Sequence, residues 1–329
     1  MSRPLRMLFV MDPIASIDIE RDTTFVLMLE AQRRGHEVFV CGLADLVIRD
    51  SRTHARVQRA RVERADPHYA LEPGAIRPLS DMHAVFMRKD PPYDMDYVYA
   101  THLLDPELGR TYVSNHPLGL REATEKLFAM RYPDLTPTTH LDRDASRLKA
   151  LLDEFGGTMV VKRLDGSGGA GVFLARRGDA NLGSILEAVT DFGRRWVLAQ
   201  RYIERAPEGD KRVIVIGGEP VGAVLRVPGG EDFRGNIHVG ARTVAAEVDD
   251  FDREVCRRMR PTFEELGLDF VGLDVIGGYV TEVNVTSPTG FQEIRELSGL
   301  VLERILLDHV EARLEAGAAA GFRPTPFER

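Results

Sequence analysis

The stretch from Phe270 to Thr289, FVGLDVIGGYVTEVNVTSPT, constrains the fold most, because two short runs rich in Val, Ile and Leu flank Gly277-Gly278. This pattern predicts a β-hairpin. Side chains alternate along a strand, so Asp274 in the first run, and Glu282 and Asn284 in the second, fall opposite the apolar side chains of their own strands. The sequence therefore predicts a polar face with two carboxylates and an amide beside a buried apolar face.

These oxygen-bearing side chains suit Mg²⁺, a hard cation usually held by one or two carboxylates together with substrate phosphates. The metal site requires that Asp274 and Glu282 lie on the same face of the hairpin. A two-residue turn at Gly277-Gly278 places Asp274 and Glu282 on opposite faces of the hairpin, whereas an odd-length turn that also includes Tyr279 places them directly across from each other. We therefore expect the odd turn. An ordinary exposed polar face is the alternative, and the hairpin alone favours neither.

Composition narrows the class of protein. The chain has 329 residues, 43% hydrophobic and 29% charged, which predicts a globular protein of two or three domains with a sizeable core. Its net charge of −8 argues against broad binding of nucleic acid or of an anionic membrane. Two cysteines, Cys41 and Cys256, are too few for a disulfide framework. No apolar stretch has the length of a membrane helix or a signal-peptide core, so we expect a cytoplasmic protein.

The first third of the chain alternates strand and helix patterns. An apolar run, Leu5 to Met11, is followed by helical spacing that begins after Asp22 and stops at Gly35, and then by a second apolar run, His36 to Cys41. This βαβ pattern predicts a parallel sheet covered by helices. The Arg-rich stretch from 50 to 80 is interpreted as a solvated edge hairpin or loop.

Polar residues follow three of the strands expected in this region: Asp12-Pro13, Arg88-Lys89-Asp90 and Asn115-His116. In open α/β sheets, ligands bind beyond the carboxyl ends of the strands. Arg88 and Lys89 could therefore hold a substrate carboxylate, Arg88 by its bidentate fork. The alternative is that Arg88 and Asp90 only pair with each other, and we favour the substrate role.

The middle of the chain contains a glycine loop, Asp165 to Gly171, between two strand patterns. The loop lacks the P-loop signature, and the strand after it does not fit the dinucleotide fingerprint. A strand–loop–strand flap remains, whose N–H groups can approach phosphates, although tight hairpins also use glycine. Lys126 and Lys162 are candidate phosphate contacts, or else ordinary solvated lysines. Helices are expected from Thr124 onwards, from Leu148 to Phe155 and from Asn181 to Phe192.

The last part of the chain predicts a second sheet and a loop over it. Strands are expected at Trp196 to Ile203, at 213–216 and at 220–227, and helices at Asp249 to Gly267 and Val301 to Glu315. The backbone after Ile203 could read an adenine edge. The polar stretch from 228 to 242 is typical of an active-site lid or of a disordered loop. Its Arg234, Asn236, His238 and Arg242 suit anionic groups.

Several motifs together resemble the bacterial glutathione synthetases of the ATP-grasp superfamily. They are MDPIASI, MRKDPP, NHPLGLREATEKLF, LDGSGG, AQRY, EGDKRVIVI, GEPV, RGN, FVGLDVIG and TEVNVTSPT, from about Leu5 to about Leu314. MDPI, MRKDPP and TEVNVTSPT together are specific, whereas LDGSGG alone fits many ATP-grasp proteins. The resemblance implies an α/β, ATP-grasp fold with a parallel-sheet N-terminal domain (1–122), a central lid domain (123–202), a mixed α+β C-terminal domain (203–315) and a loose tail (316–329).

The resemblance also implies an activity. ATP would phosphorylate the cysteinyl carboxylate of γ-glutamylcysteine, and glycine would attack the acyl phosphate, giving glutathione, ADP and phosphate. The implied ligands of Mg²⁺, or of Mn²⁺ in its place, are Asp274, Glu282 and Asn284. Nucleotide contacts would be Lys126, Lys162, Gly166, Ser167, Gly168, Gly169, Gln200, Arg201, Tyr202, Ile203, Asp210 and Arg212. Catalytic residues would be Arg212, Arg226, Arg234 and Asn236, and substrate contacts Asp12, Pro13, Arg88, Lys89, Asn115, Arg242, Ser287 and Thr289. The family also implies a homo-oligomer, a dimer or tetramer, with no nucleic-acid or membrane partner.

The sequence departs from the family pattern in three places. Asp232-Phe233 stands where a single Thr is usual, Gly240-Ala241-Arg242 replaces GGR, and Gln292 replaces the arginine of an Ile-Arg-Glu-Ile run. If that arginine binds a substrate carboxylate, Gln292 would hold it less strongly. Two alternatives therefore remain: an ATP-grasp ligase for another carboxylate and amine, and a nucleotide-binding protein without turnover. The joint presence of the metal-ligand set with Arg212 and Arg226 argues against the second.

Overall fold

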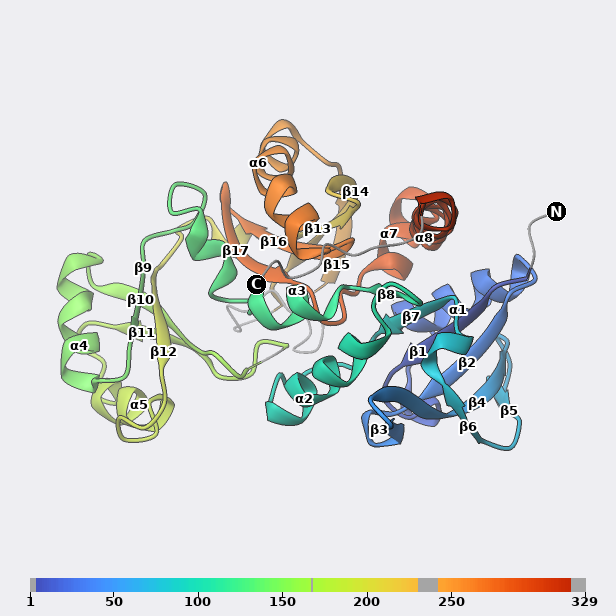
Figure 1. Cartoon of the computed structure of the whole chain (residues 1–329). Coiled ribbons are helices and arrows are strands. Elements are labelled where there is room, and N and C mark those ends of the chain that lie inside the picture. Colours follow the sequence, from blue (N-terminus) through green and yellow to red (C-terminus); the bar gives the residue numbers. More distant parts are fainter. Residues whose placement is uncertain (1–3, 167, 230–241, 321–329) are drawn as a thin grey trace.

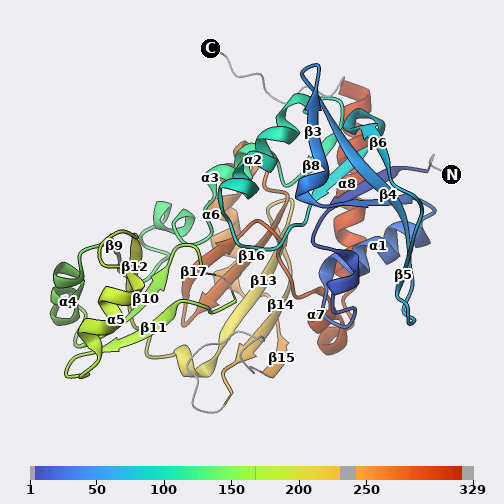
Figure 2. The ribbon, with the colours of Figure 1, turned by 90° about the horizontal axis from the view of Figure 1, so that it is seen from below.

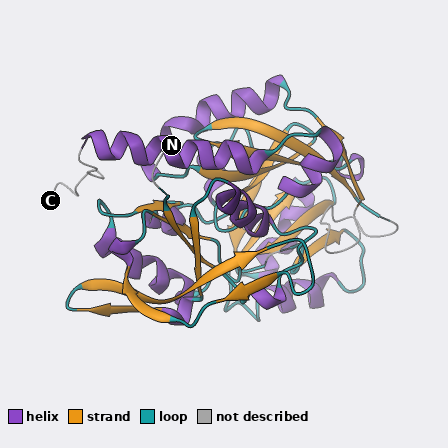
Figure 3. Ribbon diagram, turned by 90° about the vertical axis from the view of Figure 1, so that its right-hand side faces the viewer, coloured by secondary structure: helices purple, strands orange, loops and turns teal. Residues whose placement is uncertain are grey.

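The computed structural model describes residues 4–166, 168–229 and 242–320 (Figure 1). Within these ranges the strands form three sheets, and helices lie against them, as the side view of Figure 3 shows. None of the helices in the described ranges combines the length and the apolar character needed to cross a membrane.

The N-terminal sheet has the strand order β3-β4-β2-β1-β7-β8. Its parallel part confirms the predicted βαβ pattern and consists of β1 (Arg6–Val10), β2 (Glu37–Cys41), β7 (Ala84–Met87) and β8 (Tyr112–Ser114). Helix α1 (Thr23–Arg33) begins as predicted, because the Asp22 carboxylate accepts a hydrogen bond from the Phe25 N–H at 2.6 Å. Helices α2 (Met95–Leu104) and α3 (Pro117–Glu122) follow β7 and β8.

The Arg-rich stretch from 50 to 80 forms antiparallel hairpins at the edge of the N-terminal sheet, so the predicted edge hairpin is confirmed and the alternative of a loop is wrong. Strand β4 (Arg52–Val62) has 11 residues and pairs with β2, and β3 (Leu46–Arg49), β5 (Tyr69–Leu71) and β6 (Ala75–Pro78) pair with it. The charges occupy the solvated face of the strand. Arg56 and Arg61 are exposed, whereas Val57 and Val62 between and beyond them are buried.

The second sheet is antiparallel and has the order β11-β10-β12-β9. Its strands are β9 (Thr139–Asp142), β10 (Thr158–Arg163), β11 (Val172–Arg176) and β12 (Val197–Arg201). Helices α4 (Ala145–Glu154) and α5 (Leu182–Val189) pack on this sheet, and α4 lies on the side away from the rest of the molecule (Figure 2). The glycine loop joins β10 to β11, as predicted.

The third sheet is also antiparallel, in the order β15-β14-β13-β16-β17. Its strands are β13 (Asp210–Ile216), β14 (Glu219–Val227), β15 (Arg242–Ala246), β16 (Phe270–Ile276) and β17 (Tyr279–Asn284). Helix α6 (Asp250–Leu266) starts with a capping box at Asp249 and ends at the left-handed Gly267. Helices α7 (Phe291–Ser298) and α8 (Leu302–Ala320) follow. Helix α8 continues past Glu315, so residues 316–320 are helical, and the remainder of the expected tail lies outside the described residues.

A second prediction, that a helix opens at Thr124, is wrong. Residues 124–127 form a turn ahead of the short 3-10 helix η5 (Phe128–Arg131). The reason is that this segment covers the free edge of β17: the N–H of Val283 donates to the Glu125 carbonyl at 2.9 Å, and the N–H of Val280 donates to the Leu135 carbonyl at 2.8 Å. These two bonds fix the segment along the edge of β17, where it forms the turn and the 3-10 helix in place of an α-helix.

The apolar cores are of two kinds: clusters shared by the N-terminal sheet and the third sheet, and a cluster confined to the second sheet. Side chains of the N-terminal sheet and of the third sheet pack into common clusters, as Phe9 and Phe25 do with Ile214, Phe291 and Leu306. The second sheet, which belongs to the expected lid domain and is called the lid sheet below, has a cluster of its own, built from α4, α5 and the inner faces of its strands. The lid is thus a separate packing unit attached to a continuous two-sheet body.

Candidate active site

The β16–β17 hairpin brings Asp274 opposite Glu282, but not through the predicted odd turn. The turn is the two-residue Gly277-Gly278, since Ile276 pairs with Tyr279 and Val275 with Val280. The register then shifts, so that Thr281 is the extra residue of a β-bulge and Asp274 pairs with Glu282. Both glycines have positive φ, 56° and 84°, which is the requirement of a tight hairpin turn. The two glycines were therefore the signal for the short turn.

Asp274 is buried among cations. Its side chain accepts hydrogen bonds from Arg212, from Nε to Oδ1 at 2.5 Å and from Nη2 to Oδ2 at 3.0 Å. Arg226 Nη2 lies 2.9 Å from Oδ1, and the amide of Asn284 donates to Oδ2 at 3.2 Å. Burial raises the pKa of Asp274, but the two guanidinium groups outweigh burial and hold that pKa well below its ordinary value.

Asp210 is the second carboxylate of this buried cluster. Arg226 Nη2 donates to its Oδ2 at 2.5 Å, while no described residue hydrogen-bonds its buried Oδ1. Burial raises the pKa of Asp210 to about 7, against the opposing charge of Arg226 and with the help of the negative charge on Asp274. Two carboxylates and two guanidinium groups, Arg212 and Arg226, thus form one compact charged network on β13, β14 and β16.

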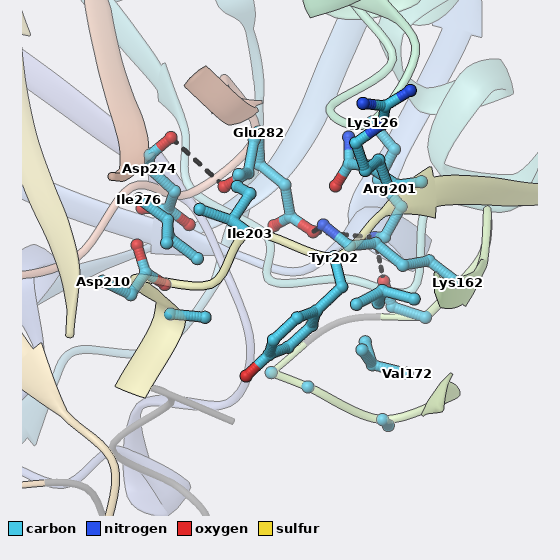
Figure 4. A pocket seen from close by; sticks show the side chains of 18 residues that line it. Lys126, Lys162, Val172, Arg201, Tyr202, Ile203, Asp210, Asp274, Ile276 and Glu282 are labelled. Carbon is cyan, nitrogen blue, oxygen red and sulfur yellow. Dashed lines mark hydrogen bonds and ion pairs between the residues drawn. The ribbon is translucent and has the colours of Figure 1, made fainter. Parts of the chain in front are cut away.

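Glu282 faces two lysines. Its Oε1 is 3.9 Å from Lys126 Nζ and 3.8 Å from Lys162 Nζ (Figure 4). Lys126 Nζ also donates to the Gly166 carbonyl at 2.5 Å, which ties the glycine loop to the same point. Two ammonium groups from different parts of the chain therefore converge beside a carboxylate of β17, an arrangement suited to an anionic ligand accompanied by a cation.

The two lysines and the carboxylates Asp210, Asp274 and Glu282 line an open cavity, whose empty space, including the solvent at its mouth, is about 790 Å³. Most of the predicted nucleotide contacts line the cavity: Lys126, Lys162, Gly166, Gly168, Gly169, Gln200, Arg201, Tyr202, Ile203 and Asp210, with Asp274 and Glu282. Ser167 lies outside the described residues. Arg212 reaches the cavity only through Asp274. Sequence reasoning missed the apolar lining, Val160, Val172 and Ile276. Alternation would have found two of these residues, because Val160 lies two positions from Lys162 and Ile276 two from Asp274.

The cavity lining mixes apolar and charged side chains. Ile203 and Ile276 lie beside Asp274 and Glu282, and Val172 lies on the side of Lys162, with Tyr202 between them (Figure 4). A ligand with a flat apolar part and a polyanionic part fits such a lining.

The oxygen ligands fit a divalent cation in part. Asn284 uses its amide nitrogen for the Gly272 carbonyl and for Asp274, which leaves its amide oxygen for a cation. Glu282 meets the lysines only at the long distances given above. Both oxygens of Asp274, in contrast, already accept from guanidinium groups, and the described residues contain no group of three or more His, Cys, Asp or Glu side chains able to hold a metal. Glu282 and Asn284 are thus ready ligands, and Asp274 would need its arginine partners to shift.

The predicted substrate residues separate into two groups. Asp12 and Lys89 form an ion pair at 2.9 Å at the ends of β1 and β7, next to Pro13, and the N–H of Asp90 donates to Asp12 at 3.1 Å. Ser287 and Thr289 follow β17, and the side chain of Thr289 is exposed. Arg242 is exposed at the start of β15, opposite Val227. Arg234 and Asn236 lie outside the described residues.

Arg88 and Asn115 belong to the second group, because protein groups already hold them. Arg88 is buried and donates to Thr24 Oγ1 at 3.0 Å and to the Pro288 carbonyl at 2.9 Å, rather than pairing with Asp90. Burial lowers the pKa of Arg88, and its Nη1 has no partner among the described residues. Asn115 donates to the Phe270 and Val285 carbonyls and accepts from the Phe270 N–H. The structure therefore places both residues at the contact between the two large sheets.

At Gln292 we expected weaker binding of a substrate carboxylate, but this side chain bonds other residues of the chain instead. Its amide N–H groups donate to the carbonyls of Ile19 and Asp22, and its oxygen accepts from Arg64. The side chain has no donor left for a substrate carboxylate, because an amide carries two N–H groups.

Comparison with known proteins gives the family. Residues 5–121 match the model of the prokaryotic glutathione synthetase N-terminal domain, and residues 125–299 match that of the prokaryotic glutathione synthetase ATP-grasp domain. A glutathione synthetase of Gloeobacter violaceus is 43% identical over 313 residues, which cover 92% of this chain and 96% of the relative. One of Escherichia coli O127:H6 is 42% identical over 309 residues, covering 93% and 98%.

Solved structures agree on the fold. D-cycloserine synthetase DcsG is similar with a TM-score of 0.65 at 16% identity, over 94% of this chain and 99% of that one. The ATP-grasp ligase PsnB, complexed with minimal precursor, Mg and ADP, is similar with a TM-score of 0.59 at 17% identity, over 94% and 98%. The expected ATP-grasp fold is confirmed. The two family models and the relatives together show that this chain belongs to the prokaryotic glutathione synthetase family.

Proposed function

We propose that this protein is an ATP-dependent ligase that joins γ-glutamylcysteine to glycine, giving glutathione, ADP and phosphate. The observation that carries the proposal is the cavity in which Lys126, Lys162 and the glycine loop meet Glu282. Carboxylate and amine do not condense in water without activation, and a phosphoryl group supplies the leaving group that the carboxylate lacks. Membership of the glutathione synthetase family names the two substrates.

In this proposal ATP binds with its base beside Tyr202 and Ile203 and its phosphates beside Lys126 and Lys162. Tyr202 and Ile203 border the base, and their backbone can read its edge. Lys126 and Lys162 contact the phosphates, and the N–H groups of the glycine loop approach them closely. Glu282, Asn284 and Asp274 would hold Mg²⁺, or Mn²⁺ in its place. When bound, the metal ion neutralises phosphate charge and acts as a Lewis acid.

The first chemical step transfers the γ-phosphoryl group. An oxygen of the cysteinyl carboxylate forms a bond to the γ-phosphorus as the bond from phosphorus to the ADP oxygen breaks. We assign Arg212 and Arg226 to the charge that develops on the moving group, because both bond Asp274, which lines the cavity. Arg226 Nε is buried without a partner among the described residues, which leaves it a donor to spare.

The second step forms the peptide bond. The amine of glycine attacks the acyl carbon, the bond from carbon to the phosphate oxygen breaks, and the amine loses a proton as phosphate leaves. The acyl phosphate hydrolyses readily, so the site must exclude water while the intermediate exists. The lid sheet has this role in the proposal, because its glycine loop is already tied to Lys126 at the cavity.

We place the dipeptide between the phosphates and the ends of β1 and β7. Asp12, Pro13, Lys89, Ser287, Thr289 and Arg242 remain its proposed contacts, and Arg234 and Asn236 remain predictions. Arg88 and Asn115 also remain proposed contacts. Both side chains hold the contact between the two large sheets, and Arg88 keeps a buried Nη1 without a partner among the described residues. The proposal includes the three domains predicted from the sequence (1–122, 123–202 and 203–315), a cytoplasmic location, and a dimer or tetramer without nucleic-acid or membrane partners.

An ADP-release assay over a panel of dipeptides and amines tests the proposed function. We expect ADP only when γ-glutamylcysteine and glycine are both present, with glutathione formed in equal amount. Faster release with another dipeptide or amine would assign the chain to a different ATP-grasp ligation. ATP binding without ADP release for every pair would contradict catalysis altogether.

A further inference from the structure

Residues 285–292, which run from the end of β17 into the first turn of α7, form a junction segment whose polar groups bind several distant elements. The Val285 carbonyl accepts from Asn115, the Thr286 hydroxyl donates to Glu125, and the Pro288 and Thr289 carbonyls accept from Arg88 and Arg212. The segment thus contacts the end of β8, the chain next to Lys126, the end of β7 and the start of β13. It lies between the nucleotide side and the dipeptide side of the proposed site.

Gln292 anchors the far end of the junction segment. Its side chain is buried, with 6% of its surface exposed. Its Nε2 donates to the Ile19 carbonyl at 3.0 Å and to the Asp22 carbonyl at 2.8 Å, and its Oε1 accepts from Arg64 Nη2 at 2.5 Å. One amide therefore has all of its groups bonded to residues of the N-terminal part of the chain.

Arg64 holds the same loop from the opposite side. Its Nη1 lies 3.3 Å from the Ile19 carbonyl and 3.3 Å from Glu20 Oε2, and its guanidinium lies 5.7 Å from the centre of the Phe25 ring. Residues 14–22, the β1–α1 loop, are thus clamped between α7 and the chain that follows β4.

This clamped loop matters for the reaction because of what lies at its two ends. At one end it continues from Asp12, which pairs with Lys89 at the proposed dipeptide site. At the other end Asp22 caps α1, whose Thr24 hydroxyl accepts from Arg88. Neither Gln292 nor Arg64 lines the nucleotide cavity.

We propose that Gln292 and Arg64 are a pair of positioning residues for the dipeptide: they fix the β1–α1 loop so that Asp12 and Lys89 keep one geometry. Neither residue touches the reacting atoms. The inference rests on the proposed function, since it concerns the dipeptide half of that site. The inference predicts an effect on dipeptide binding and none on ATP binding, because a change in Gln292 or Arg64 alters the β1–α1 loop and leaves the nucleotide cavity intact.

Steady-state kinetics of Gln292→Glu test the pair. The carboxylate keeps the shape of the side chain but loses both donors and faces two carbonyl oxygens. We expect the KM for γ-glutamylcysteine to rise about tenfold, with kcat and the KM for ATP within about threefold of wild type. Gln58→Glu, on the solvent side of β4, is the matched control and should leave all three unchanged. An equal rise in both KM values, or a fall in kcat alone, would overturn the positioning role.

An exchange of the two side chains gives the sharper test. Gln292→Arg alone brings a second guanidinium against Arg64, and we expect the largest rise in the dipeptide KM. The double variant Arg64→Gln/Gln292→Arg keeps the summed length and the donor–acceptor pair, so its KM should return to within about threefold of wild type. A double variant no better than Gln292→Arg would refute the pairing. Arg64→Gln, at a partly exposed position, serves where a Gln292 variant fails to fold, with exposed Arg61→Gln as its control.

Hydrogen exchange without substrates keeps this inference separate from the proposed function. The amides of Arg21 and Asp22 donate to the Asp18 carbonyl and report on the β1–α1 loop. In Gln292→Glu they should exchange about tenfold faster, while amides of β10 in the lid keep their wild-type rates. Uniformly faster exchange would indicate a general loss of stability and overturn the inference. Wild-type protein that fails to use γ-glutamylcysteine and glycine would refute the proposed function, while the exchange rates would still decide whether the pair holds the loop.

Discussion

At the scale of single residues, the two carboxylates expected to bind metal differ in their partners. Asp274 is buried and bonded to two guanidinium groups, whereas Glu282 is half-buried and meets its lysines only at 3.8–3.9 Å. A buried ion pair leaves an uncompensated charge when one partner is removed, and a loosely paired, half-buried charge does not. The two carboxylates should therefore respond differently to the same neutralising substitution.

Asp274→Asn should abolish ligation and also destabilise the fold, because Arg212 and Arg226 lose their shared counter-charge. We expect the free energy of unfolding to fall by about 3 kcal/mol. Glu282→Gln should reduce ligation at least about a hundredfold, with the free energy of unfolding within about 1 kcal/mol of wild type. Urea unfolding and the ADP-release assay measure both effects. Equal losses of stability in the two variants, or normal turnover in either, would contradict this assignment.

Asp210 gives a prediction about pH. Its pKa in the folded protein is about 7, raised from 3.8 by burial. The folded state therefore binds the proton more tightly than the unfolded state, and Asp210 contributes stability that is lost as pH rises from about 4 to about 7. In Asp210→Asn this loss should disappear. Urea unfolding at a series of pH values would show a flatter profile for the variant, and parallel profiles for variant and wild type would contradict the shifted pKa.

At the scale of elements, the β16–β17 turn is held against the hinge, the segment from Ile203 to Arg205 that follows β12 and whose Ile203 lines the cavity. Gly277 has a φ of +56°, and a Cβ there would lie 2.8 Å from Cγ2 of Ile203 and 3.1 Å from Cβ of Arg205. Gly278 has a φ of +84°, but a Cβ there would meet nothing within 4 Å. The two glycines share the backbone requirement, and only the first also packs on the hinge.

Gly277→Ala and Gly278→Ala are therefore a matched pair. Each should lower the free energy of unfolding by about 1–2 kcal/mol, because alanine in the left-handed region is strained. Gly277→Ala should in addition push Ile203 and raise the KM for ATP several-fold, whereas Gly278→Ala should leave that KM unchanged. ATP titration of both variants separates the effects. An unchanged KM in Gly277→Ala would show that the turn does not position the hinge.

The same hairpin shows how far sequence patterns lead. Local patterns predicted the two strands, the glycine loop between β10 and β11, and the helix caps at Asp22 and Asp249, because each depends on residues a few positions apart. The bulge at Thr281 was not predicted, since alternation assumes a regular register. The roles of Asn115 and Gln292 were not predicted either, because their partners lie 155 and 273 residues away along the chain.

At the scale of the whole molecule, the lid and the two-sheet body have separate cores. Leu152 of α4 is 2% exposed within the lid cluster. Leu306 of α8 is fully buried in the cluster that α8 forms with α1 and the third sheet. The lid carries Lys162 and the glycine loop, whereas the body carries Asp274 and Glu282. The nucleotide cavity therefore depends on two packing units at once.

Leu152→Ala and Leu306→Ala should therefore weaken different parts of the same enzyme. Each truncation of a buried leucine costs about 2–5 kcal/mol in the unit that contains it. Leu152→Ala should loosen the lid, raise the KM for ATP and leave the main thermal transition near its wild-type temperature. Leu306→Ala should lower the main transition and leave the KM for ATP nearly unchanged below it. Calorimetry with and without ATP distinguishes the two, because ATP bound across both units should restore the lid transition of Leu152→Ala. One transition shifted equally by both substitutions would show that lid and body unfold as one unit.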